Sequence, residues 1–227
     1  AYQLYVERVI PNGAGTLAAS YEERKARLLA DGLFDEARKK PLPPFPKSIG
    51  VVTSPSGAVL RDIHRVAKRR WPTVRIVLYP ATVQGAVAAE QVAAGISFFN
   101  EVYPVDVLIV GRGGGSAEDL SAFNEEIAVR AVAGSRIPVI SAVGHETDYT
   151  LADFAADVRA ATPSQAAELA VPDGEALRRH VAGLRVRLEN AREGWLSAKR
   201  ARLTALSQHA LFRDPQRFLR FRQIAAR

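Results

Sequence analysis

The sequence predicts an α/β protein: an open parallel sheet with flanking helices, in a Rossmann-like order of elements, followed by a long projecting C-terminal helix. Two observations support this prediction. Short β-branched runs alternate with helix-length segments between Ser48 and Val143, which is typical of a parallel sheet with right-handed crossovers. From Asp173 to Ala210, apolar residues then recur in heptad-like steps of four and three, which indicates one long helix.

Before the sheet, the chain contains two periodic segments. Tyr2–Ile10 alternates like a strand, and Pro11 to Gly13 end it. Leu17–Ala30 has the pattern of a charged helix, which Asp31 and Gly32 should end. The proline-rich stretch 41–46 then forms a stiff linker to the sheet.

Four strands are expected in the central part, with helices between them. The strands are expected at Ser48–Thr53, Val74–Tyr79, Val107–Val110 and Pro138–Val143, and the helices at Ala58–Arg70, Ala88–Asn100 and Ala117–Ala133. The apolar runs are short, β-branched and bounded by glycine or proline, as buried strands are. In an open α/β sheet, the loops after parallel strands lie at one edge and line the ligand crevice.

The chain after residue 148 is expected to become helical. Thr162, Pro163 and Ser164 have the pattern of a helix start with proline in the first turn. A helix over Asp173–Ala210 would be about 55 Å long at 1.5 Å per residue, and Phe218–Arg227 would begin a returning helix. We therefore expect a connector over residues 1–47, an α/β domain over 48–172 and a helical region over 173–227.

Composition limits the environment and the partners of the chain. There is no cysteine, which fits a reducing compartment, and we expect a cytoplasmic protein. No apolar run approaches the ~20 residues of a membrane span. There is also no methionine, so Ala1 is not expected to be the natural start.

The net charge is +7, and residues 174–227 hold 13 Arg/Lys against 4 Asp/Glu. This excess of positive charge suggests either a polyanionic partner or a solvated basic helix.

The loop after the third expected strand reads Gly111, Arg112, then three glycines and a serine. Glycines at a turn that opens a helix let backbone N–H groups approach an anion, and arginine can bind a phosphate through two parallel hydrogen bonds. The spacing fits neither G-x-G-x-x-G nor a P-loop. A tight turn would need only one glycine, so we expect phosphate binding. The expected phosphate ligands besides Arg112 are Gly113, Gly114, Gly115 and Ser116.

The loop after the fourth expected strand brings His145 and Asp148 to the same edge. A histidine with a carboxylate in local reach can act as general acid, general base or nucleophile in phosphoryl transfer. Asp62, in the second turn of the first sheet helix, is a further candidate, and with Asp148 it could hold a divalent ion such as Mg²⁺. Asp153 and Asp157 would share a helix face if that segment is helical. Because this depends on whether the helix forms, they are second-tier candidates.

These motifs resemble the large subunit of exonuclease VII. The resemblance rests on IGVVTSPSGAVLRDI, VLIVGRGGGSAEDLSAFN and IPVISAVGHETDYTLADFAADVRAATPSQAAEL, which occur in the family's order. It implies a nuclease that hydrolyses single-stranded DNA from both ends to short oligonucleotides, with no strict metal requirement. Matched position by position, the family's important residues are Asp62, Arg112, His145 and Asp148.

The resemblance also implies missing regions and partners. The family's N-terminal OB-fold domain is absent, and its C-terminal coiled-coil region, which carries the small subunits, is present only at its beginning. The expected partners are single-stranded DNA and the small subunits, and self-association of the long helix stays open. Two other functions remain open: a non-catalytic phosphate-binding module, which would not need His145, and an assembly scaffold built on the long helix.

Overall fold

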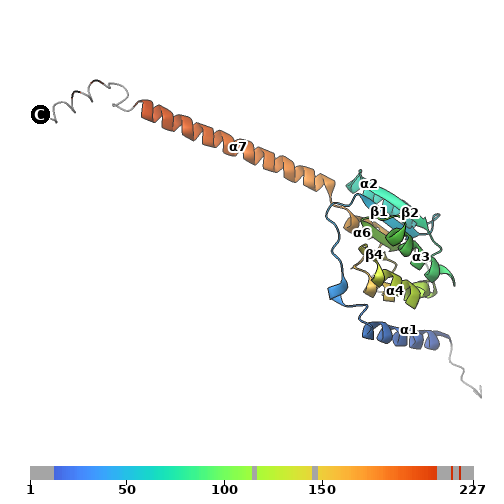
Figure 1. Ribbon diagram of the computed structural model, residues 1–227. Helices are drawn as coiled ribbons and strands as arrows, with labels where there is room; N and C mark the ends of the chain where they lie inside the picture. Colours follow the sequence, from blue (N-terminus) through green and yellow to red (C-terminus); the bar gives the residue numbers. More distant parts are fainter. Residues whose placement is uncertain (1–12, 114–116, 145–147, 209–215, 217–219, 221–227) are drawn as a thin grey trace, which may run out of the picture. The chain divides into compact units, whose positions relative to one another are not determined.

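The computed structural model describes residues 13–113, 117–144, 148–208, 216 and 220. The chain divides into two compact units, Ala1–Gly174 and Glu175–Arg227. The first unit contains a five-stranded parallel sheet between two layers of helices, and the second contains nearly all of helix α7, Gly174–Ser207 (Figure 1). The predicted fold class is confirmed, including the long C-terminal helix.

The sheet has the strand order β2-β1-β3-β4-β5, and every neighbouring pair is parallel. Its strands are β1 (Ser48–Thr53), β2 (Arg75–Pro80), β3 (Val107–Gly111), β4 (Val139–Ala142) and β5 (Val158–Arg159). The first four confirm the predicted strands. The fifth was not predicted, because two residues are too few to show the alternation by which a strand is recognised.

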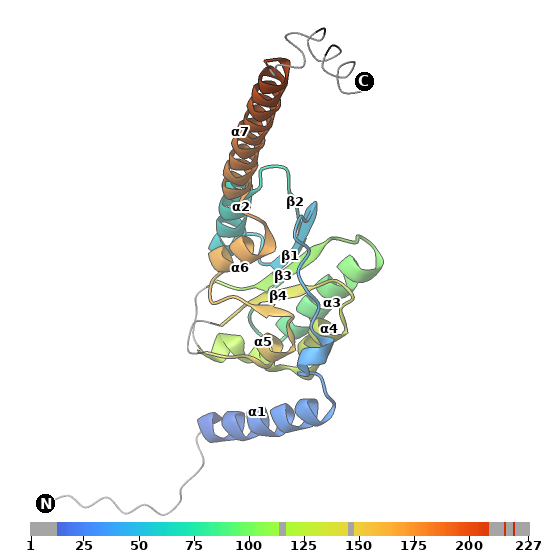
Figure 2. The ribbon, with the colours of Figure 1, turned by 90° about the vertical axis from the view of Figure 1, so that its left-hand side faces the viewer.

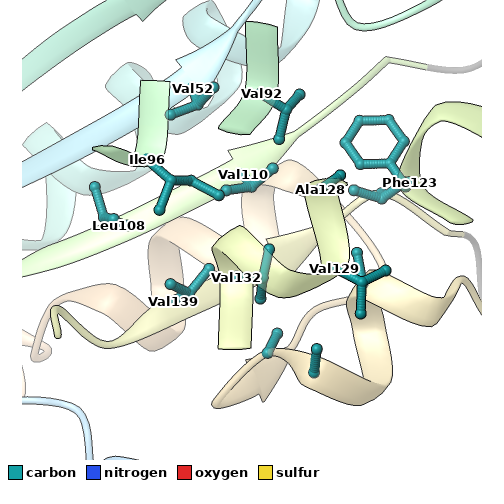
Figure 3. Close-up of a cluster of buried hydrophobic side chains, with 14 of the residues drawn as sticks. Val52, Val92, Ile96, Leu108, Val110, Phe123, Ala128, Val129, Val132 and Val139 are labelled. Carbon is teal, nitrogen blue, oxygen red and sulfur yellow. The ribbon is translucent and has the colours of Figure 1, made fainter. Parts of the chain in front are cut away.

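Helices cover both faces of the sheet. They are α2 (Ala58–Arg70), α3 (Ala88–Glu101), α4 (Glu126–Gly134), α5 (Leu151–Ala155) and α6 (Pro163–Ala170). One buried cluster joins α2 and α6 to the sheet through Ile49, Val51 and Ile109. The other joins α3 and α4 to Val52 and Leu108 on the opposite face (Figures 2 and 3). Neighbouring residues of β1 thus enter different layers, as the two-residue period of a strand requires.

This topology places a crevice between β1 and β3. The chain leaves β1 through α2 on one face, whereas it leaves β3 towards α4 on the other face. The two adjacent loops at the carboxyl ends therefore diverge, and this switch point is where open α/β sheets bind ligands. For the order 2-1-3-4-5, the switch point lies between β1 and β3.

The single helix expected over Ala117–Ala133 is wrong. The structure has a 3₁₀ helix, η2 (Ala117–Asn124), and then α4, with an extended backbone at Glu125 (φ −73°, ψ 137°) between them. Tertiary hydrogen bonds hold this break. Asn124 Oδ1 accepts the N–H of Leu151 at 2.8 Å, and the Asn124 carbonyl accepts a bond from Arg24 at 2.7 Å. The sequence pattern could not show these distant partners.

The N-terminal helix is confirmed as α1 (Gly13–Ala30), and the short 3₁₀ helix η1 (Glu36–Arg38) follows it. Gly32 has φ +69°, and the N–H of Leu33 donates to the carbonyl of Leu28 at 3.1 Å. Glycine is thus the helix-ending residue the sequence predicted. The predicted strand Tyr2–Ile10 lies outside the described residues, and so does the returning helix Phe218–Arg227 except for the helical residue Arg220. In the part of the chain that the structure describes, no helix is long and apolar enough to cross a membrane.

Candidate active site at the switch point of the sheet

Arg112 lies directly after β3 and is held close to the backbone. Its side chain is buried, with the residue 4% exposed. Its backbone N–H donates to the carbonyl of Ala142 at 3.2 Å, which extends the pairing of β3 with β4. Its Nε donates to the carbonyl of Gly113 at 2.9 Å. The guanidinium, which is charged at any physiological pH, is therefore fixed at the carboxyl edge of the sheet.

Asp62 reaches the same edge from α2. The helix begins at Ala58, so Asp62 lies in its second turn, where its half-exposed carboxylate accepts a bond from Arg65 at 2.7 Å. The i,i+3 spacing explains this pair, which is worth only a few tenths of a kcal/mol at the surface of a helix. The carboxylate is therefore held weakly by its neighbour and can change partner when a ligand binds.

A small cavity of about 140 Å³ brings the expected residues together. Asp62, Arg112 and Gly113 line it, and so does Gly144 at the end of β4. Two of the four expected catalytic residues, from segments 50 positions apart in the sequence, thus share one cavity. Its volume suits a small group such as a phosphate rather than a whole nucleotide.

The loop after β4 carries the other two expected residues. His145 lies outside the described residues, as do Gly114, Gly115 and Ser116. Asp148 is described and is exposed. A Cβ atom built on Gly144 would overlap the backbone carbonyl of Asp148, and it would also lie 3.2 Å from a carboxylate oxygen of Asp153. The backbone of Asp148 therefore lies against Gly144, a glycine that lines the cavity.

Comparison with known proteins identifies the family. A family model described as exonuclease VII, large subunit, matches residues 33–226. The chain belongs to the exonuclease VII large-subunit family. It is 55% identical to the exodeoxyribonuclease 7 large subunit of Streptococcus gordonii over 218 residues. These aligned residues make up 96% of this chain and 49% of that protein. The corresponding protein of Bacillus subtilis is 50% identical over 216 residues, 95% of this chain and 48% of its own length.

A third relative, the exodeoxyribonuclease 7 large subunit of Geobacillus kaustophilus, is 52% identical over 216 residues. This third match covers 95% of this chain and 48% of the Geobacillus protein. The chain therefore spans about half the length of the curated relatives it matches.

Within this exonuclease VII family fold, Asp153 and Asp157 have structural positions. They were expected to share a helix face only if their segment is helical, and this condition is not met, because α5 ends at Ala155. Asp153 is buried and accepts bonds from Ser141 Oγ at 2.6 Å and from the backbone N–H of Thr150 at 2.8 Å. It thereby completes the capping box of α5 and ties the start of that helix to β4.

Asp157 joins the linker before β1 to the end of the sheet. Its Oδ1 accepts the backbone N–H of Lys40 at 2.7 Å, and its Oδ2 accepts that of Val139 at 2.7 Å. Lys40 Nζ also lies 3.0 Å from Oδ1. Both oxygens are thus engaged in holding backbone, so we assign Asp157 no part in the chemistry.

The sequence interpretation missed the start of α6 as part of the site. Ala161, Thr162 and Pro163 line the cavity that contains Arg112. Thr162 is the N-cap of α6, and its Oγ1 accepts the N–H of Gln165 at 3.1 Å. The positive end of the helix dipole therefore faces the same small space as the guanidinium, which favours an anion there. The signal was present, since Thr-Pro-Ser was recognised as a helix start, but its position opposite β3 depends on the fifth strand.

The described acidic residues do not form a clear metal site. Among the described residues, no three His, Cys, Asp or Glu side chains lie together as metal ligands would. Asp62 lines the small cavity, and Asp148 does not. Hard cations such as Mg²⁺ prefer several oxygen ligands, so the described residues alone do not fit such an ion, and we derive no step through one.

Proposed function

We propose that this chain is the catalytic part of a nuclease that hydrolyses the phosphodiester bonds of single-stranded DNA, from both the 5′ and the 3′ end, to short oligonucleotides. The observation that carries the proposal is the small cavity at the switch point, where Asp62, Arg112 and the end of β4 meet. Membership of the exonuclease VII large-subunit family and the names of the relatives support it.

In this proposal, Arg112 binds the scissile phosphate. A buried guanidinium can donate two parallel hydrogen bonds to phosphate oxygens, and it stabilises the negative charge that grows there during attack. The backbone amides of Gly113, Gly114 and Gly115, with Ser116, add donors on one side of the phosphate. The N-terminus of α6 adds positive potential on the other side.

His145 and Asp148 carry out the proton transfers or the attack. Water attacks phosphorus while the bond to the leaving sugar oxygen breaks, so that the water loses a proton and the sugar oxygen gains one. If His145 attacks first instead, water breaks the phosphorus–nitrogen bond in a second step. His145 supplies or removes the proton, or acts as the nucleophile. Asp148 orients the imidazole, and Asp62 offers a second carboxylate across the cavity.

The remaining segments serve assembly in this proposal. We infer that residues 48–172 form the catalytic domain, that residues 1–47 connect it to a preceding domain, and that residues 173–227 begin a helical region that binds small subunits. Large apolar side chains of α7 are exposed, including Leu188 at 71% and Trp195 at 61%. Such a stripe on a long helix suits a helical partner, which is a small subunit or a second copy of the chain.

Cleavage assays on the full-length protein, assembled with its small subunit, test this function. Single-stranded oligonucleotides labelled at the 5′ or the 3′ end should both yield short products, and duplex DNA of the same sequence should not. His145→Ala should abolish cleavage while retaining DNA binding. Arg112→Ala should weaken binding and abolish cleavage.

The same variants separate the two other functions. A non-catalytic phosphate-binding module would tolerate His145→Ala and be impaired only by Arg112→Ala. An assembly scaffold would tolerate Asp148→Ala and lose its function when residues after Gly174 are removed. Cleavage at the wild-type rate by both the His145 and Asp148 variants would therefore refute hydrolysis at this site.

A further inference from the structure

A second, larger cavity of about 430 Å³ lies next to the small one. Arg112 and Gly113 line both, so the two cavities adjoin at these two residues. The larger one extends towards β2, between the loops that follow β1 and β2. Its volume lies within the range of about 300–1,000 Å³ in which proteins bind small organic ligands.

The walls of this cavity combine apolar surface with neutral polar groups. Pro55, Pro80 and Ala81 supply apolar surface, and the polar groups come from Ser54, Gln84 and Gln91. Among its described lining residues there is no Asp or Glu, and Arg112 is the one charged side chain. A polyanion can therefore enter without meeting a carboxylate.

The polar groups can bond to a base without selecting one. Gln91 Oε1 accepts a hydrogen bond from the backbone N–H of Thr82 at 2.6 Å. This bond fixes the loop after β2 and leaves the amide nitrogen of Gln91 as the group that can donate to a ligand. Gln84 is exposed on the same loop. Side-chain amides both donate and accept, so they can pair with the edge of any base. A nuclease that acts on any sequence needs this tolerance.

The two cavities together suit one nucleotide and its phosphate. The small cavity, bounded by Asp62 and the start of α6, has room for the phosphate group alone. The strand must continue away from that phosphate, and the larger cavity adjoins it across Arg112. We propose that the larger cavity is a nucleotide subsite, in which the base and sugar next to the scissile phosphate bind against Pro55 and Pro80 and within reach of Gln84 and Gln91. The proposal rests on the nuclease function proposed above.

Kinetics of the full-length assembled protein on a single-stranded oligonucleotide test this subsite. Gln84→Glu places a carboxylate in the cavity, which should repel the strand and raise KM by roughly tenfold, the order of one lost base contact. The value of kcat should stay within about twofold, because a contact made equally in the ground and transition states affects KM alone. The matched control is Ser97→Glu, which adds the same charge on the exposed surface of α3, outside both cavities.

A substrate series provides a second, independent measurement. One abasic nucleotide is moved stepwise along the oligonucleotide, and the rate of cleavage at a defined bond is recorded. With the wild type, KM should rise only when the abasic position adjoins that bond. With Gln84→Glu, the same position should have little further effect, because the contact is already lost.

The outcomes distinguish this inference from the function on which it rests. If Gln84→Glu and the adjoining abasic position leave KM unchanged while Arg112→Ala abolishes cleavage, the subsite is refuted and the nuclease function stands. If Arg112→Ala also cleaves normally, the proposed function fails, and the subsite fails with it. A rise in KM with Ser97→Glu equal to that with Gln84→Glu would likewise overturn the subsite, because the effect would then come from net charge.

Discussion

Gly144 is the residue whose replacement tests the shape of the loop after β4. A Cβ atom there would overlap the Asp148 carbonyl, so Gly144→Ala must move the segment that carries His145 and Asp148. We predict that cleavage falls at least tenfold, because displacements of about 1 Å in a catalytic group have effects of this size or larger. The measurement is kcat for a single-stranded oligonucleotide, together with the midpoint of thermal unfolding.

Gly134→Ala is the matched control for this prediction. Nothing lies within 4 Å of a Cβ built on Gly134, at the end of α4. Alanine there should leave cleavage unchanged and leave stability equal or slightly higher, by up to about 1 kcal/mol. Full activity of Gly144→Ala would contradict the packing of the loop described above.

At this scale, the sequence predicted the proximity of Asp62 and Arg112 better than the positions of the buried carboxylates. The proximity of Asp62 and Arg112 followed correctly from the rule that loops after parallel strands share an edge. Asp153 and Asp157 do not share a helix face, because α5 ends at Ala155. Asp153 binds Ser141 and the backbone of Thr150, and Asp157 binds backbone N–H groups of two distant segments. Residue spacing shows which side chains share a local helix face. It cannot show which backbone N–H group will donate a hydrogen bond to a given carboxylate in the folded protein.

Among the elements, the amino ends of β1 and β3 are joined by one carboxylate. Asp106 Oδ2 accepts the backbone N–H groups of Lys47 and Ser48, both at 2.8 Å, and the hydroxyl of Ser48 at 3.0 Å. Burial raises the pKa of Asp106, but these hydrogen bonds and the Lys47 charge together outweigh it and hold the pKa below its usual value. The ionised form is therefore favoured by folding.

This pKa shift predicts a pH-dependent loss of stability. Because the folded-state pKa is below the unfolded value of about 3.9, the stabilisation is present above about pH 4 and is lost as the pH falls through the folded pKa. Asp106 is exposed, so solvent screens its interactions, and Asp106→Asn should lower the free energy of unfolding by about 0.5–1 kcal/mol at pH 7. Urea unfolding of both proteins, followed from pH 7 to pH 3, should show this difference shrinking below about pH 4.

Glu101→Gln removes one negative charge near the same edge and provides the control for this titration. Glu101 is exposed at the end of α3, so its replacement should change stability by less than about 0.5 kcal/mol across the pH range. An Asp106→Asn difference that stays constant, or that grows in acid, would contradict the role of the ionised carboxylate.

Helices and strands were predicted correctly where the hydrophobic periodicity of the sequence is strong. They were missed where hydrogen bonds to distant residues determine the local structure. The long buried strands and α2 have clear sequence patterns, and the structure confirms them. The break at Asn124 and the two-residue strand β5 depend on partners more than 15 positions away. The start of α6 faces the cavity only because β5 sets its position, so that contribution to the site could not be predicted either.

For the whole molecule, the chain covers about half of its relatives' length. We expect this 227-residue chain alone to bind single-stranded DNA weakly and to cleave it poorly, because the other half of the relatives' length can add stacking and backbone contacts to a single strand. The ratio of kcat/KM for the chain to that for the full-length assembly measures this, at one fixed salt concentration. Equal values would refute it.

The central claim is that the residues around the small cavity act together in one hydrolytic site. A double-mutant cycle of Arg112→Lys and His145→Gln in the full-length assembly tests it most directly, with kcat/KM for a single-stranded oligonucleotide as the measured quantity. Residues that act as a unit are strongly non-additive, so each single variant should lose at least about 100-fold and the double variant little more than the worse of the two. Losses that simply multiply, or a single variant with wild-type kcat/KM, would contradict a shared site.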